Sequence, residues 1–94
     1  MLQIYLNENV VVDTLSKVAY VGCLAKIEED SLHLNNVTIF DDAVIRIPLD
    51  QFLVECASFG ITPSRKSIWI NRDKVLSVSP IRDIIVPGSL ADSS

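Results

Sequence analysis

Two strand-rich blocks, residues 9–40 and 67–79, flank one short stretch whose apolar residues recur at helical spacing. The β-branched run at residues 10–12 favours extended backbone. Gly22 lies inside the next predicted strand, where a glycine commonly marks a bend or a close backbone approach. The third predicted strand, residues 32–40, changes the parity of its apolar residues at Asn35-Asn36, as a bulge or a corner does. These features predict a small, strongly bent sheet.

The connection between the two blocks predicts one helix over about residues 48–59. Pro48 suits the first helical position, and Gly60 is suited to the stop just beyond the last turn. Residues 67–71 and 74–79 are the last two predicted strands, joined by a tight turn at Arg72-Asp73. The predicted fold class is therefore mainly β, a five-stranded barrel with the helix between strands 3 and 4. We expect one domain over residues 1–86 and a flexible tail at 87–94.

Charge is unevenly distributed along the chain. The net charge is −4, which argues against indiscriminate binding to nucleic acid, because phosphate contact needs Lys and Arg. Residues 1–64 carry three basic and nine acidic side chains, whereas residues 65–82 carry five basic and one acidic. This basic strip is compatible with a confined anion or RNA site, and equally with a solvated face.

Other classes of function have weak signals. No apolar run approaches the roughly 20 residues of a membrane span, and nothing in the N-terminal sequence indicates export, so we expect a cytoplasmic protein. Cys23 and Cys56 are isolated and read as reduced core thiols. The acidic turn at residues 28–30 is a candidate cation ligand, but a solvated turn accounts for it better. We expect no metal, no cofactor and no enzymatic activity.

The two blocks match a known pattern. Residues 10–37 read VVVDTLSKVAYVGCLAKIEEDSLHLNNV, in which Val21, Gly22 and Leu24 fit a hydrophobic-Gly-x-Leu signature before an acidic turn and a Leu-rich strand. Residues 68–78 read IWINRDKVLSV, comparable with a hydrophobic-Arg-Gly-x-x-Val signature. Over residues 9–85 the chain resembles the Sm-like (LSm, Hfq-type) family, and within it a branch of small bacterial proteins of unassigned role. The resemblance implies an SH3-like, Sm-like barrel.

The resemblance also implies an RNA site. In RNA-binding members an Asp and an Asn after the second strand and the Arg of the Arg-Gly pair form a uridine pocket. Here Glu28 stands at the Asp position, Ser31 at the Asn position, and Asn71-Arg72 replaces Arg-Gly. Strand alternation predicts that Arg72, one position late, points to the opposite face. The candidate RNA-binding residues are Glu28, Ser31, His33, Asn71 and Arg72, and for His33 a structural role is the stronger alternative.

Assembly is the last implication. A five-stranded barrel leaves unpaired edges, and Sm-like domains pair the fourth strand of one subunit with the fifth of the next, a head-to-tail contact that closes a ring. The resemblance implies about five to seven subunits. For Trp69 a base-stacking role is the alternative to an interface role. The candidate interface residues are Ile68, Trp69, Ile70, Val75, Leu76 and Val78.

Two functions follow from these features. The first is a homo-oligomeric ring that binds single-stranded RNA at its subunit turns, which the resemblance favours. The second is a non-catalytic interaction scaffold with the same ring, no RNA role, and a protein partner held by the helix or by a strand edge. The acidic composition and the altered uridine pocket favour the second.

Overall fold

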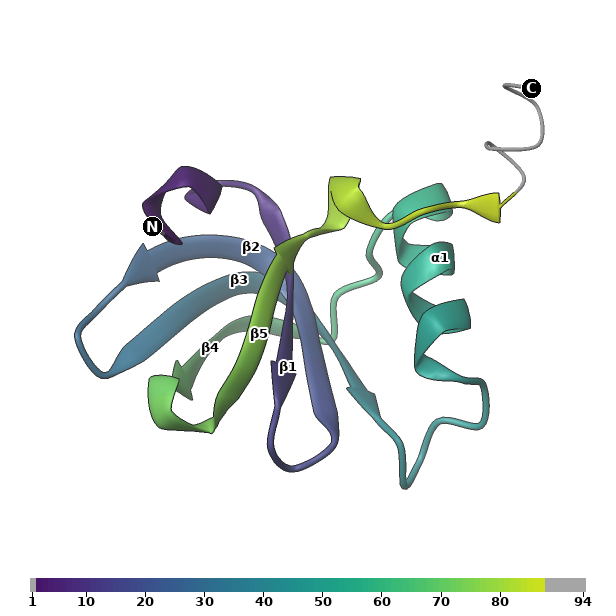
Figure 1. Cartoon of the computed structure of the whole chain (residues 1–94), viewed down its shortest axis with the longest axis horizontal. Helices are drawn as coiled ribbons and strands as arrows, with labels where there is room; N and C mark the ends of the chain where they lie inside the picture. Colours follow the sequence, from purple (N-terminus) through teal and green to yellow (C-terminus); the bar gives the residue numbers. More distant parts are fainter. Residues whose placement is uncertain (1, 88–94) are drawn as a thin grey trace.

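The computed structural model describes residues 2–87, which form one bent antiparallel sheet and one helix (Figure 1). The strand order is β4-β3-β2-β1-β5. This arrangement confirms the predicted fold class. Of the predicted tail, residues 88–94 lie outside the described residues. The elements are η1 (Leu2–Tyr5), β1 (Asn9–Thr14), β2 (Val18–Ile27), β3 (Ser31–Asp41), α1 (Leu49–Phe59), β4 (Arg65–Asn71), η2 (Arg72–Lys74), β5 (Val75–Pro80) and η3 (Ile81–Asp83).

The sheet bends where the sequence predicts it. A Cβ added at Gly22 would lie 2.9 Å from the carbonyl oxygen of Asn35 and 3.0 Å from a methyl carbon of Val37. Asn36 has a φ of 53°, in the left-handed region, and the register between β2 and β3 shifts at this point. The predicted bulge is confirmed, and the bent strands approach each other too closely for a side chain at position 22.

Both faces of the sheet are covered near its centre. Val10 and Val12 of β1 point into the curl of the sheet, where they join the inner core with Leu24, Leu32, Leu34, Val37 and Ile70. Val11 points the other way, and with Val21 of β2 it packs against Leu53 and Cys56 of α1. The ring centroids of Phe40 and Phe52 lie 5.2 Å apart and join β3 to the same helix. All three valines of β1 are therefore buried.

The helix begins and ends close to its predicted limits. Pro48 is the N-cap and α1 starts at Leu49, one residue later than predicted. Gly60 ends it with a φ of 91° and donates its N–H to the carbonyl of Cys56 at 3.0 Å. Because glycine adopts a positive φ without steric cost, this position suits a helix stop. Within residues 2–87, no helix is long and apolar enough to cross a membrane.

The two ends of the sheet are open. β4 and β5 stand at opposite ends of the strand order and each pairs with one neighbour, β3 and β1 respectively. Each carries a large apolar side chain that is more than half exposed, Trp69 at 53% and Leu76 at 64%. An exposed edge strand of this kind presents unpaired N–H and C=O groups.

Candidate nucleic-acid interface

Two turns distant in sequence meet at one end of the sheet. Ser31 at the start of β3 pairs in register with Asn71 at the end of β4. Just beyond, the backbone N–H of Arg72 donates to the carbonyl of Asp30 at 2.8 Å. The Arg72 guanidinium donates through Nη1 to the carbonyl of Glu28 at 2.9 Å, across 44 residues. The turn at 28–31 and the turn at 71–73 thus form one surface, which we call the paired turns.

The position of Arg72 differs from the one that strand alternation predicts. β4 ends at Asn71, and Arg72 is the first residue of η2. The backbone therefore leaves the extended conformation just before Arg72, so the alternation of side chains does not reach it. The guanidinium lies over the turn at Glu28 rather than on the opposite face.

The paired turns are predominantly acidic. Glu29, Asp30, Asn71, Arg72 and Asp73 line a shallow pocket there, which places three carboxylates beside one guanidinium. The carboxylate of Glu28 is outside this lining and forms an exposed ion pair with Lys26, with Oε1 and Nζ 3.3 Å apart. A phosphate approaching this pocket meets a single cation. The amide of Asn71 and the remaining guanidinium nitrogens are better suited to the polar edge of an unpaired base.

His33 is part of an aromatic pair two residues along the strands. It is in register with Trp69, and the two rings stack with centroids 4.3 Å apart and planes 7° from parallel. Both residues alternate with inner-core residues, so both lie on the outer face of the sheet. Among residues 2–87, the His33 Nε2 is a buried atom with no hydrogen-bond partner. The structure therefore places His33 beside the paired turns but outside the pocket lining.

The fold is similar to that of solved structures, whereas the sequence alone matches no known family. No family model matches the sequence, and no curated protein matches it. The Sm protein of Pyrococcus abyssii in complex with a uridine heptamer is 18% identical, with a TM-score of 0.57 over 84% of this chain and 90% of that one. The chain has the Sm-like fold. The SmAP (LSm) protein of Methanococcus vannielii is 22% identical, with a TM-score of 0.54 over 83% and 86% of the two chains.

A third solved structure is also similar to this chain. A chain from the NatC complex bound to CoA is 14% identical, with a TM-score of 0.54, and the match covers all of this chain and 95% of that one. At these identities the likeness establishes the fold, and the predicted resemblance is confirmed at that level.

The candidate interface residues of the Sm-like fold divide into two groups. Ile70 belongs to the inner core of its own chain, and Ile68, Val75 and Val78 pack against that core. Trp69 and Leu76 instead expose most of their side chains. Their role in assembly stays a prediction, and of the six candidates Trp69 and Leu76 have the side chains most available to a neighbour.

Among the described residues, the cysteines and acidic side chains form neither a reactive thiol site nor a metal site. Cys56 is 8% exposed on the face of α1 that packs against the sheet. Burial, with a smaller contribution from Glu55, raises the pKa of the Cys56 thiol. A raised pKa disfavours the nucleophilic thiolate. Within residues 2–87, no group of three or more His, Cys, Asp or Glu side chains is arranged to hold a metal ion.

The sequence predicted the candidate residues, but it did not predict which residues they contact in the folded chain. His33 and Trp69 each stand between two core residues, so a shared outer face was readable. Their stacking depends on the register of β3 against β4, which neither strand encodes alone. The contribution of Asp30 was also missed, because it acts through its backbone carbonyl and leaves no signal in the sequence.

Proposed function

We propose that this chain assembles through β4 and β5 into an Sm-like ring that binds single-stranded RNA at the paired turns. One observation carries the proposal: Arg72 joins the turns at 28–31 and 71–73 into a single surface, in a fold shared with an Sm protein in complex with a uridine heptamer. Head-to-tail pairing of two unlike edges closes into a ring when the rotation between subunits fits. The resemblance suggests about five to seven copies.

The chemistry of the paired turns favours contact with bases over contact with phosphates. The side chain of Arg72 is exposed, and only its Nη1 is used in binding Glu28. The guanidinium plane is therefore open to stack on a base, an interaction worth about 1–3 kcal/mol per base for side chains of this kind. The nearby carboxylates oppose phosphate binding, so the affinity of one subunit is expected to be low. A ring repeats the site, and repeated weak sites on one strand bind by avidity.

A salt titration of oligonucleotide binding tests this proposal. Fluorescence anisotropy with U-rich and A-rich strands is measured at about 50 mM and about 200 mM salt. Arg72→Ala removes the guanidinium but keeps the backbone bond to Asp30 and the pairing of Ser31 with Asn71, so the two turns stay joined. Arg46→Ala is the matched control, because Arg46 is also exposed but lies in the loop before α1.

The expected result is measurable affinity at low salt that weakens as salt rises, weakens about fivefold or more in Arg72→Ala, and is unchanged in Arg46→Ala. Loss of binding by about 1–3 kcal/mol is what removal of one stacking or base-edge contact causes. An absence of binding at low salt, with the ring intact, rejects the RNA role.

The second candidate function is a non-catalytic interaction scaffold built on the same ring. Two observations favour it: the pocket at the paired turns is mainly acidic, and the matching chain from the NatC complex, a protein complex, covers the whole of this one. On this proposal α1 holds the partner, since Phe59 at its C-terminal end is 87% exposed. If the ring forms but binds no oligonucleotide at low salt, the result supports the scaffold function over the RNA-binding function.

A further inference from the structure

We propose that Trp69 of one copy packs into a groove beside β5 of the next copy and locks the two edges together. The inference rests on the proposed ring and adds the side chain and the receiving surface that hold it.

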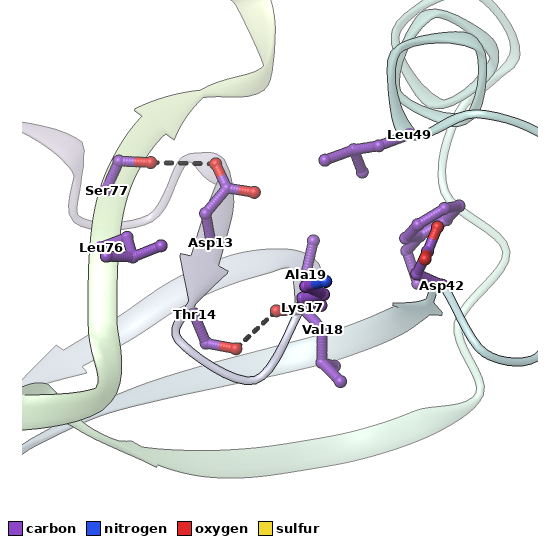
Figure 2. A pocket seen from close by; sticks show the side chains of 10 residues that line it. Asp13, Thr14, Lys17, Val18, Ala19, Asp42, Leu49, Leu76 and Ser77 are labelled. Atoms are coloured by element: carbon purple, nitrogen blue, oxygen red, sulfur yellow. Dashed lines mark hydrogen bonds between the residues drawn. The ribbon is translucent and has the colours of Figure 1, made fainter.

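The groove lies between the outer face of the sheet and the start of α1 (Figure 2). It has a volume of about 590 Å³, and its apolar lining comes from β5, β2, β3 and α1: Leu76, Val18, Ala19, Phe40 and Leu49. Figure 2 shows Leu49 and Leu76 extending toward each other from opposite sides. An open apolar groove between two layers is a surface that burial against another chain would stabilise.

Leu76 is turned into this groove by a bulge. Asp13 pairs with Ser77 and Thr14 pairs with Val75, so Leu76 is the extra residue of β5. Val75 and Val78 pack against the inner core, whereas Leu76 stays 64% exposed. Bulges at sheet edges commonly redirect a side chain for a specific purpose. Here the bulge places a leucine at the mouth of an apolar groove.

Trp69 lies on the matching face of the other edge. In β4 it alternates with Ile68 and Ile70, which face the inner core, so its indole is on the outer face. One ring face stacks on His33, yet 53% of the residue is exposed. When two edge strands pair, their outer faces become one continuous surface. Pairing of β4 with the β5 of a neighbour therefore places Trp69 on the same surface as that copy's Leu76 and its groove.

The charges around the groove are complementary to those on β4 of a second copy. The beginning of β4 exposes Arg65 and Lys66. The rim of the groove carries Asp13 and Asp42 against a single cation, Lys17. The rim of the groove is therefore net acidic and the start of β4 is basic, which favours contact between the β4 of one copy and the groove of the next. The same acidic rim disfavours the phosphates of an RNA strand.

The test uses the fluorescence of Trp69, the single tryptophan of the chain. Wild-type protein is diluted from high to low concentration, and its mass, emission maximum and iodide quenching are followed together. We expect blue-shifted, poorly quenched emission in the assembled protein and red-shifted, readily quenched emission after dissociation. In Leu76→Glu, we expect dissociation at a concentration about tenfold or more higher, since a buried interface leucine is replaced by a charge.

Ile4→Glu is the matched control, because Ile4 is 66% exposed in η1, away from both edges, and its assembly is expected to equal the wild type. Both substitutions are at exposed positions, and circular dichroism checks that each variant folds. A wild type that is monomeric at every concentration overturns the ring and this inference together. An intact oligomer with freely quenched Trp69, or with Leu76→Glu unaffected, overturns the inference alone. Quenching of Trp69 by oligouridine in the intact oligomer would assign the indole to RNA and also overturn it.

Discussion

Gly22→Ala is expected to destabilise the protein because the added methyl group has no room. Its Cβ would lie 2.9 Å from the Asn35 carbonyl oxygen, 3.0 Å from a Val37 methyl carbon and 3.2 Å from the Val37 Cα. Two of these three atoms belong to the backbone of β3, so a change of rotamer cannot relieve the contact. Inserting a methyl into a packed core costs about 1–3 kcal/mol. The lower entropy of the unfolded alanine chain offsets about 0.4–1 kcal/mol of this.

The mid-range values give a net loss of about 1.3 kcal/mol, which corresponds to a fall in Tm of roughly 5–10 °C for a domain of this size. Thermal unfolding followed by circular dichroism measures it, at one fixed protein concentration because assembly also contributes to stability. Val37→Ala in the Gly22→Ala background removes only the methyl contact, so it should restore little stability. A Gly22→Ala variant as stable as the wild type would refute the close approach of β2 and β3.

Three further predictions use the same stability and reactivity assays. Asn36 has a φ of 53°, so Asn36→Val should cost about 1–3 kcal/mol in thermal unfolding while Asn36→Gly should cost nothing; equal losses would contradict the bulge geometry. Cys56 is buried and its thiol pKa is raised, whereas Cys23 is half-buried. A thiol reagent at mildly alkaline pH should therefore modify Cys23 first and Cys56 only on unfolding. Equal rates of modification of the two thiols would be inconsistent with this packing. The ion pair of Arg82 with the half-buried Glu8 lies at the surface, so Glu8→Gln should leave the Tm almost unchanged, and a clear fall in Tm would show that the pair is structurally important.

The bend of the sheet was predictable because its determinants are local. Gly22 and Asn35-Asn36 predict the bend from the sequence, and in the structure Gly22 lies against the backbone of Asn35. The sequence did not predict which side chains of β1 face the inner core and which face α1. Three consecutive valines carry no alternation, so the pattern cannot say that Val10 faces the inner core while Val11 packs under α1.

The candidate site was predictable in its residues and less so in its geometry. The turn after β2 and the end of β4 were both identified, and they meet as the resemblance implies. The placement of Arg72 depends on whether β4 ends one residue earlier or later, which is finer than a sequence pattern resolves. The groove beside Leu76 draws on four strands and a helix, so only the folded chain assembles it.

The proposed pairing of β4 with β5 between copies is tested most directly by the mass of the protein in solution. Sedimentation velocity across a range of micromolar concentrations measures that mass for the full 10.4 kDa chain. A single species of about five to seven copies is the predicted result. A species with the mass of one chain at every concentration would contradict the ring, and with it the use of the two open edges.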